Sequence, residues 1–275
     1  MKAQEGALTA AAITQGLETS VIGKAVHCYE RVGSTNDIAR KFAKAGAAEG
    51  SVILAEEQTA GRGRMARRWI APPYSSILMS LLLRPALAPP QLARVTMAAA
   101  LVVCDAIGSE TGLDTAIKWP NDILVHAKKC AGILAEGEIA GDQVDYVIVG
   151  LGLNVNFRSG SIEGIPEDAT TLADELRRPV PRAGLVRAIL TAVERYYLRL
   201  QAGTSLRADW AQRMATLGRM VHARTPWGEE TGTAEDVEED GALLLRRADG
   251  SLARLVAAEV TLAEVKPTEE ESRWN

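Results

Sequence analysis

The feature that most constrains the fold is a long run of apolar segments separated by turn residues in the middle of the chain. It reads AIKWPNDILVHAKKCAGILAEGEIAGDQVDYVIVGLGLNVNF, from Ala116 to Phe157. Turn signals divide it at Pro120–Asp122, His126–Lys129 and Gly141–Asp142, and the intervening segments have the length and apolar content of strands. The run therefore predicts successive strands of one sheet.

Segments on either side add further strands and several helices. The expected strands span residues 25–31, 51–58 and 75–85, and the expected helices span residues 34–46, 90–112, 182–202 and 205–216. In the first of these helices, a Ser-Thr-Asn run can cap the first turn and a glycine can end the last one. Together these segments predict an α+β fold in which helices cover a mixed β-sheet.

The pattern changes near Gly218 to short alternating runs. Asp240-Gly241 and Asp249-Gly250 separate the later runs, and an Asp-Gly pair is a strong hairpin signal. We therefore expect a first domain at residues 1–216, a small β-barrel at residues 217–265 and a loose polar tail at residues 266–275.

Composition excludes several classes of protein. Apolar residues make up 47% of the 275 residues, which allows a large core, and the net charge of −4 argues against a general nucleic-acid binder. The three cysteines are far apart without a CxxC pair, so we expect neither zinc nor disulfides, and a reduced cytoplasmic setting. No membrane span is expected. The short apolar patch at residues 7–13 predicts a frayed or a packed helix rather than a signal peptide.

The segment GRGRMARRW, residues 61–69 and here called the arginine loop, predicts an anion site. Its four arginines are Arg62, Arg64, Arg67 and Arg68. Arginine stays charged and grips carboxylate or phosphate with two parallel bonds. Gly61 and Gly63 allow the backbone to approach a ligand closely, and four like charges would repel one another without an anion. A solvated arginine run, paired with the acidic tail, is the alternative interpretation.

Five motifs in order along the chain resemble the signatures of biotin protein ligases, also called biotin–[acetyl-CoA-carboxylase] ligases. The arginine loop resembles their GRGRxGRxW pattern. The five motifs are STND from Ser34, AEEQTAGRGR from Ala55, which runs into the arginine loop, KWPNDILV from Lys118, KCAGILAE from Lys129 and GLGLNVN from Gly150. The segments TGTA, EDGALLL and AAEVTL resemble the family's C-terminal SH3-like domain, so the resemblance covers roughly residues 25–262.

This resemblance implies an ATP-dependent ligase that works in two steps. The carboxylate of biotin attacks the α-phosphorus of ATP, which gives biotinyl-5′-AMP and pyrophosphate. A lysine of a biotin carboxyl carrier domain, from acetyl-CoA carboxylase or a related carboxylase, then attacks the mixed anhydride and releases AMP. The arginine loop is expected to fold over the adenylate and shield it from water. By analogy the resemblance also implies a homodimer joined through the sheets.

The resemblance assigns biotin to the turn before the first helix, the arginine loop and a lysine. The residues are Ser34, Thr35, Asn36, Gln58, Arg62, Gly63, Arg64 and Lys129. Short polar side chains and free N–H groups at a helix start suit a ureido ring and a nearby anion, although the same residues also suit an ordinary N-cap. An amide such as that of Gln58 can both donate and accept.

The residues assigned to ATP binding and catalysis partly overlap with those assigned to biotin. The resemblance assigns ATP to Arg64, Arg67, Lys118, Asn121 and Asn154, and catalysis to Lys129, Arg64 and Asp122. A lysine charge beside the α-phosphate would stabilise the charge that develops in the transition state, and Asp122 would orient or deprotonate the incoming lysine. From the sequence alone Lys129 also fits a surface lysine of a hairpin turn, and Trp119 fits a core residue. We assign no metal ligand, and Mg²⁺ is expected to arrive with ATP.

Two features depart from the family's pattern. Ala66 stands where the family usually has glycine, and if that position needs a positive φ the alanine costs about 1 kcal/mol. Some members carry an N-terminal DNA-binding helix-turn-helix, whereas about 25 residues precede the first expected strand here. We therefore expect a monofunctional ligase that does not bind nucleic acid.

Three other functions compete with this interpretation. A lipoate or octanoate ligase or transferase of related fold is the nearest, and the arginine loop and C-terminal barrel favour biotin over it. A nucleic-acid-binding regulator would use the same arginines, but the acidic net charge opposes it. A dinucleotide-dependent oxidoreductase would use GLGLNV as its fingerprint, which lacks the third glycine and is not followed by an expected helix.

Overall fold

Seven strands form the mixed sheet that the sequence predicts. The structure, a computed structural model, describes residues 6–262. The strands are β1 (Val26–Val32), β2 (Val52–Gln58), β3 (Ser76–Leu83), β4 (Thr115–Lys118), β5 (Asp122–Val125), β6 (Lys128–Ala140) and β7 (Gln143–Asn154). Their order across the sheet is β1-β2-β3-β7-β6-β5-β4. Strands β1 and β2 run parallel, and every other neighbouring pair is antiparallel.

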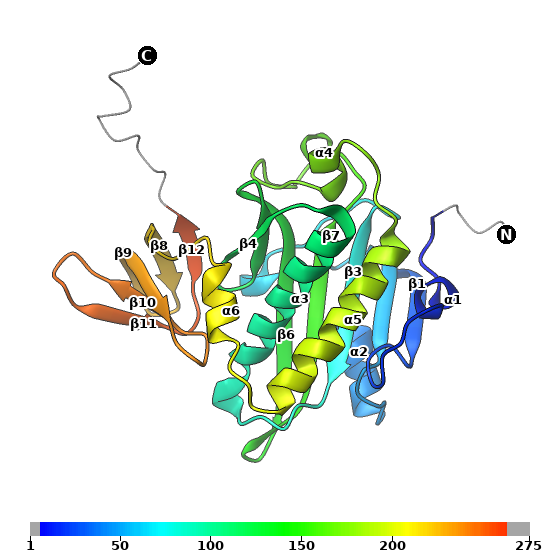
Figure 1. Cartoon of the computed structure of the whole chain (residues 1–275), viewed down its shortest axis with the longest axis horizontal. Helices are drawn as coiled ribbons and strands as arrows, with labels where there is room; N and C mark the ends of the chain where they lie inside the picture. The colour runs from blue at the N-terminus through cyan, green and yellow to red at the C-terminus, as the bar shows by residue number, and fades with distance from the viewer. Residues whose placement is uncertain (1–5, 263–275) are drawn as a thin grey trace.

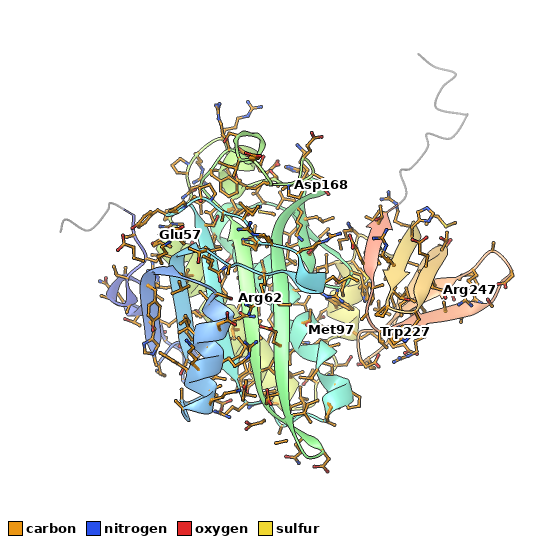
Figure 2. The ribbon with its side chains drawn as sticks, turned by 180° about the vertical axis from the view of Figure 1, so that it is seen from behind. Glu57, Arg62, Met97, Asp168, Trp227 and Arg247 are labelled. Carbon is orange, nitrogen blue, oxygen red and sulfur yellow. The ribbon has the colours of Figure 1, made fainter. Side chains whose placement is uncertain are left out.

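Helices cover both faces of this sheet. They are α1 (Ala10–Thr14), α2 (Thr35–Lys44), α3 (Ala93–Thr111), α4 (Leu172–Leu176), α5 (Arg182–Gln201) and α6 (Arg207–Gln212). Helices α3 and α5 lie together on one face (Figure 1), and α2 lies on the other, which Figure 2 shows from behind. Val52 and Leu54 of β2 belong to the larger core, whereas Ile53 packs with the α2 side. Because β2 is buried on both faces, it reads as a continuous apolar run in the sequence.

Helix ends agree with the sequence where local chemistry sets them. Helix α3 ends at Gly112, whose φ of 75° is the left-handed conformation that glycine favours. It begins at Ala93 rather than near Pro90, because Pro89–Gln91 forms a separate 3₁₀ turn. The helix expected at residues 205–216 is shorter, Arg207–Gln212. Helix α4, at Leu172–Leu176, is absent from the sequence prediction.

One helical stretch has the length and apolarity of a membrane span, which the sequence analysis did not anticipate. Pro89–Thr111 has a mean hydropathy of 1.6. Its central residues, however, lie in the main core and pack against α5 and the sheet, as those of a core helix do. Length and composition by themselves are therefore weak evidence for a span.

The C-terminal part is a small antiparallel sheet, consistent with the expected SH3-like barrel. Its strands are β8 (Met220–Thr225), β9 (Gly228–Val237), β10 (Leu243–Arg246), β11 (Leu252–Leu255) and β12 (Glu259–Leu262), in the order β11-β10-β9-β8-β12. Trp119 of the large domain is 2% exposed, and its Nε1 donates to the Gly241 carbonyl at 2.9 Å. The prediction of Trp119 as a core residue is thus confirmed. The polar tail lies outside the described residues.

A buried ion pair fixes the N-terminal segment to the large domain. The side chains of Glu56 and Arg182 are 5% and 4% exposed, and they contact each other at 2.5 Å. Arg182 donates to the Gly6 carbonyl at 2.8 Å, and the Leu8 N–H donates to Glu56 at 2.6 Å. Ile13 of α1 is fully buried, so the predicted packed helix near residues 7–13 is confirmed.

Candidate active site

The arginine loop is an ordered hairpin. The Trp69 N–H donates to the Gly61 carbonyl at 3.0 Å, and the Gly63 N–H donates to the Arg67 carbonyl at 2.8 Å. A Cβ atom on Gly61 would lie 2.7 Å from the Trp69 carbonyl oxygen, so this position requires glycine for close approach. The loop expected to fold over the adenylate is therefore a hydrogen-bonded hairpin in this structure, with a turn over Arg64–Ala66.

The left-handed backbone residue of this turn is Met65. Its φ is 52° and its ψ is 40°. The strain that the sequence analysis assigned conditionally to Ala66 therefore falls one position earlier, on an exposed methionine. A left-handed conformation costs a residue with a side chain roughly 1 kcal/mol.

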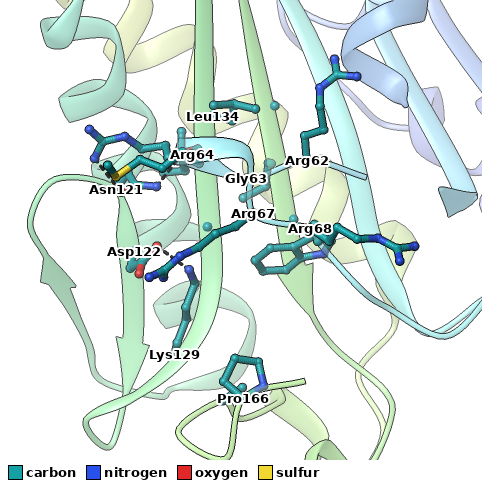
Figure 3. A pocket seen from close by; sticks show the side chains of 18 of the residues that line it. Arg62, Gly63, Arg64, Arg67, Arg68, Asn121, Asp122, Lys129, Leu134 and Pro166 are labelled. Atoms are coloured by element: carbon teal, nitrogen blue, oxygen red, sulfur yellow. Dashed lines mark hydrogen bonds and ion pairs between the residues drawn. The ribbon is translucent and has the colours of Figure 1, made fainter. Parts of the chain in front are cut away.

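The clustered arginines point in different directions and bind different partners. Arg62 donates to both oxygens of Asp37, at 2.9 and 2.6 Å, and this pairing lowers the pKa of Asp37. Arg67 forms an ion pair with Glu259 of β12. Figure 3 shows Arg62 and Arg64 on opposite sides of the loop. Protein carboxylates thus relieve the expected repulsion between arginines, and both partners lie outside the acidic tail.

Arg64 is half-buried, whereas the other three arginines of the loop are exposed. Its Nη1 donates to the Asn121 side-chain oxygen at 3.2 Å, and the Asn121 amide nitrogen donates in turn to the Ile133 carbonyl at 2.8 Å. Burial lowers the pKa of Arg64, yet a guanidinium keeps its charge at any working pH. A desolvated cation whose protein partner is a neutral amide attracts an anion strongly.

Lys129 and Asp122 meet at the β5–β6 hairpin. The Lys129 Nζ lies 2.7 Å from the Asp122 carboxylate and 5.7 Å from the centre of the Trp69 ring. Both side chains are partly buried, at 29% and 21% exposure, and both face the cavity (Figure 3). Lys128 is exposed, as expected for the less important member of the pair.

The polar first turn of α2 is bonded to the neighbouring strands. The Thr35 N–H and hydroxyl both donate to the Gln58 side-chain oxygen, at 2.7 and 3.0 Å. The Ser80 hydroxyl lies 2.7 Å from the Thr35 hydroxyl and 2.5 Å from the Asn36 side-chain oxygen. Ser34 is thus the N-cap residue by position, as expected, but without a side-chain capping hydrogen bond.

The Trp69 ring lies flat against two glycines of the sheet. A Cβ atom would lie 2.3 Å from the ring at Gly152 and 3.0 Å from it at Gly132, so side chains there would displace the ring. The buried Trp69 Nε1 and Asn154 Oδ1 have no hydrogen-bond partner in the described structure. Buried polar groups rarely stay unpaired, and both residues line the same cavity, which suggests a ligand there.

These groups surround one cavity of about 360 Å³. All residues that the sequence assigned to biotin, ATP or catalysis line it, including Lys118, which no described ion pair engages. The sequence analysis missed Trp69, the glycines beneath it, Asp168 and the β12 segment at residues 258–261. Trp69 and the glycines stood within the quoted motifs, whereas no local signal could place β12 at the cavity.

The described residues contain no group of three His, Cys, Asp or Glu side chains that could hold a metal. Asp122 and Asp168 both line the cavity. Mg²⁺ on a nucleotide takes phosphate oxygens and one or two carboxylates.

Comparisons with known proteins identify the family of the chain. The Biotin/lipoate A/B protein ligase family model matches residues 28–154, and the Biotin protein ligase C terminal domain model matches residues 216–262. The bifunctional ligase/repressor BirA of Bacillus spizizenii is 35% identical over 260 residues, which cover 94% of this chain and 80% of that protein. A biotin–[acetyl-CoA-carboxylase] ligase of Paracoccus denitrificans is 35% identical over 222 residues, which cover 78% and 92%.

Solved structures extend the similarity to the fold. The biotin protein ligase of Aquifex aeolicus, in complex with biotin and ATP, superposes with a TM-score of 0.74 at 26% identity, over 87% of this chain and 99% of that one. The Leishmania major enzyme, in complex with biotinyl-5-AMP, gives 0.58 at 26% identity, over 85% and 99%. The chain therefore belongs to the biotin protein ligase family.

Proposed function

We propose that this chain makes biotinyl-5′-AMP from biotin and ATP and transfers the biotin to a lysine of a biotin carboxyl carrier domain. The observation that carries the proposal is the convergence of Lys129, Arg64 and the Thr35–Gln58 pair on one cavity. Family membership and the relatives named as biotin–[acetyl-CoA-carboxylase] ligases support this reaction. The ligands of the two solved relatives, biotin with ATP and biotinyl-5-AMP, are its substrates and its intermediate.

The first step joins two anions, and the cations of the cavity make that approach feasible. A carboxylate oxygen of biotin attacks the α-phosphorus, the new O–P bond forms, and the bond to pyrophosphate breaks. Negative charge builds up on the α-phosphate oxygens, where Lys129 and the half-buried Arg64 would stabilise it. Lys118, Asn121, Arg67 and Asn154 would hold the nucleotide in place.

The uncharged end of biotin needs an apolar surface and a few directed polar groups. The Trp69 ring, lying on Gly132 and Gly152, supplies the surface. Thr35 and Gln58, already bonded to each other, are preorganised for the ureido ring. Ser34, Asn36, Arg62 and Gly63 complete the proposed biotin site.

In the second step the carrier lysine attacks the acyl carbon of the anhydride. The new C–N bond forms, and the bond from the acyl carbon to the AMP oxygen breaks. Asp122 would accept a hydrogen bond from the incoming amine. In the structure Asp122 holds Lys129, so this role requires the lysine to turn toward the phosphate first. Mg²⁺ belongs to the ATP as part of the substrate.

A transfer assay tests the proposal. The purified protein, biotin and Mg-ATP are incubated with and without an unmodified carrier domain, and both the adenylate and the carrier mass are followed by mass spectrometry. We expect biotinyl-AMP without the carrier and a biotinylated carrier lysine with it. Lipoate and octanoate are run in parallel, because the matching family model includes lipoate ligases as well as biotin ligases. A lipoyl adenylate without a biotinyl one would overturn the assignment.

The carrier and the assembly are the finer parts of the proposal. We expect the acceptor to be the carrier domain of acetyl-CoA carboxylase or a related carboxylase, the enzyme to work in the cytoplasm as a homodimer, and no binding of nucleic acid. The acidic net charge of −4 and the engagement of Arg62 and Arg67 by carboxylates support the last point. Sedimentation checks the dimer, and filter binding with duplex DNA checks the absence of a nucleic-acid partner.

A further inference from the structure

A continuous chain of polar contacts links the arginine loop to the turn that begins α2. Arg62 holds Asp37 through two nitrogens, and Asp37 also accepts a hydrogen bond from Arg40 at 2.9 Å. Arg40 pairs with Glu136 of β6 at 2.9 Å. Glu136 accepts a hydrogen bond from the Asn36 amide nitrogen at 2.6 Å. Two cations and two anions thus alternate along a path that ends at an amide.

The two residues at the ends of this path line the cavity. Arg62 and Asn36 both belong to the cavity wall. Asp37, Arg40 and Glu136 are not among the described residues that line it. A ligand in the cavity therefore meets the ends of the path, and the three middle residues can affect that ligand only through them.

Glu136 determines which way the Asn36 amide faces. A carboxylate only accepts hydrogen bonds, so the nitrogen of the amide faces Glu136 and the oxygen faces the Ser80 hydroxyl at 2.5 Å. Gly150 leaves room for this arrangement, since a Cβ atom there would lie 2.4 Å from the Asn36 oxygen. Ser80 also contacts Thr35 at 2.7 Å. The orientation of one amide therefore reaches Ser80, whose single hydroxyl hydrogen serves either the Asn36 oxygen or the Thr35 oxygen.

We propose that Arg40 and Glu136 are positioning residues for biotin. They fix the position of the Asn36 amide relative to the Arg62 guanidinium. The first turn of α2, beside the ureido ring of biotin, and the arginine loop, beside its carboxylate, are then arranged before biotin binds. Preorganisation of this kind raises affinity because less ordering is left to occur on binding. The inference rests on the biotin site proposed above and extends it to residues outside the cavity.

Substitution of Glu136 separates positioning from simple stabilisation. The side chains of Arg40 and Glu136 are 32% and 31% exposed, and partly exposed ion pairs contribute little to folding. Glu138 provides the matched control, because it lies two residues further along β6 on the same face. No described hydrogen bond or ion pair joins Glu138 to Asn36 or Arg40.

The measurement is the dissociation constant of biotin, without ATP, by titration calorimetry on the full chain. Glu136→Ala should weaken binding about tenfold and Glu136→Gln by a smaller factor, as loss of a charge-assisted hydrogen bond predicts. Glu138→Ala should stay within about twofold of the wild type. The KM for biotin should rise with the dissociation constant while the KM for ATP stays nearly constant, and both alanine variants should unfold within about 2 °C of each other.

A double variant tests whether Glu136 acts through Asn36. Asn36→Ala combined with Glu136→Ala should weaken binding by clearly less than the product of the two single effects. Multiplicative effects, or a Glu136→Ala variant that binds biotin as Glu138→Ala does, would overturn the positioning role while leaving the site intact. A wild-type protein that binds no biotin would remove the biotin site itself, and the inference with it.

Discussion

At the residue scale, Lys129 shows how a side chain of ordinary appearance acquires chemistry from its neighbours. The sequence places two lysines side by side in a hairpin, and residue type alone does not tell which of them faces the cavity. Alternation along the strand does, because successive side chains point to opposite faces. Lys128 faces solvent, whereas Lys129 contacts Asp122 and lies over Trp69.

Replacing this lysine should slow chemistry without harming the fold. Lys129→Ala removes the cation beside the reacting phosphate, and we expect adenylate formation to fall about 100-fold or more. The free energy of unfolding should change by less than about 1 kcal/mol, since the pair with Asp122 is partly exposed. Quenched-flow measurement of biotinyl-AMP checks the rate, with Lys128→Ala as the control. A variant that forms adenylate at the wild-type rate would exclude Lys129 from catalysis.

We expect Arg64 to retain the biotinyl-AMP intermediate in the cavity. Arg64→Ala removes the half-buried guanidinium that donates to Asn121, and we expect biotinyl-AMP to leave the preloaded protein about tenfold faster. The exposed Arg68, which has no assigned role, provides the control as Arg68→Ala. Release is followed by rapid filtration. Equal release from both variants would argue against retention by Arg64.

The half-buried thiol of Cys28 gives a prediction about pH. Burial, and to a lesser degree the charge of Glu56, raise the pKa of Cys28 to about 11. A raised thiol pKa favours the neutral form, so at pH 8 the reactive thiolate is about 0.1% of the total instead of the quarter or so expected of a free cysteine. Alkylation by iodoacetamide should therefore be about 100-fold slower than after unfolding. Its rate should keep rising with pH toward 11, and a plateau near pH 9 would contradict the assignment.

At the element scale, the sequence predicts the strands of the sheet better than the loops and short helices that pack against the sheet. The apolar runs of β2, β3 and β7 are long enough to be recognised locally. The hairpin of the arginine loop, the short helix α4 and the docking of the N-terminal segment on Glu56 depend on contacts between distant residues. Those contacts leave no periodic signal in the chain.

Strand β7 carries a glycine that the Trp69 ring needs. Gly152→Ala places a Cβ atom into that ring and should cost about 1–3 kcal/mol of stability together with at least tenfold in biotin affinity. Gly137→Ala in β6 is the control, since its Cβ atom would meet only the flexible end of Leu92, at 3.0 Å. Thermal unfolding and biotin titration check both variants. Unchanged affinity in Gly152→Ala would show that the ring is not part of the biotin site.

At the scale of the whole molecule, two domains build one cavity wall. Strand β12 returns to the large domain, where residues 258–261 line the cavity and Glu259 pairs with Arg67. The sequence suggests where the small domain begins, but it contains nothing that places this strand beside the arginine loop. The small domain therefore closes one side of the cavity.

Breaking the contact between the domains should affect the intermediate more than the fold. Glu259→Ala frees Arg67 and one end of the loop, and we expect adenylate release to rise a few-fold while the unfolding free energy changes by less than about 1 kcal/mol. Glu235→Ala breaks an ion pair with Arg246 within the small domain and is the control. Release rates that match between the two variants would show that β12 does not hold the loop.

The pairing of Arg62, Arg67 and Lys129 with carboxylates has a consequence for binding in electrolyte. An anionic substrate that enters such a cavity replaces a protein carboxylate as the partner of each cation, instead of meeting an unpaired cation. Few small ions are then taken up or released, so ionic strength has little influence on the equilibrium. The adenylate should stay bound over a range of potassium chloride concentrations that would strip a polyanion from an open arginine patch.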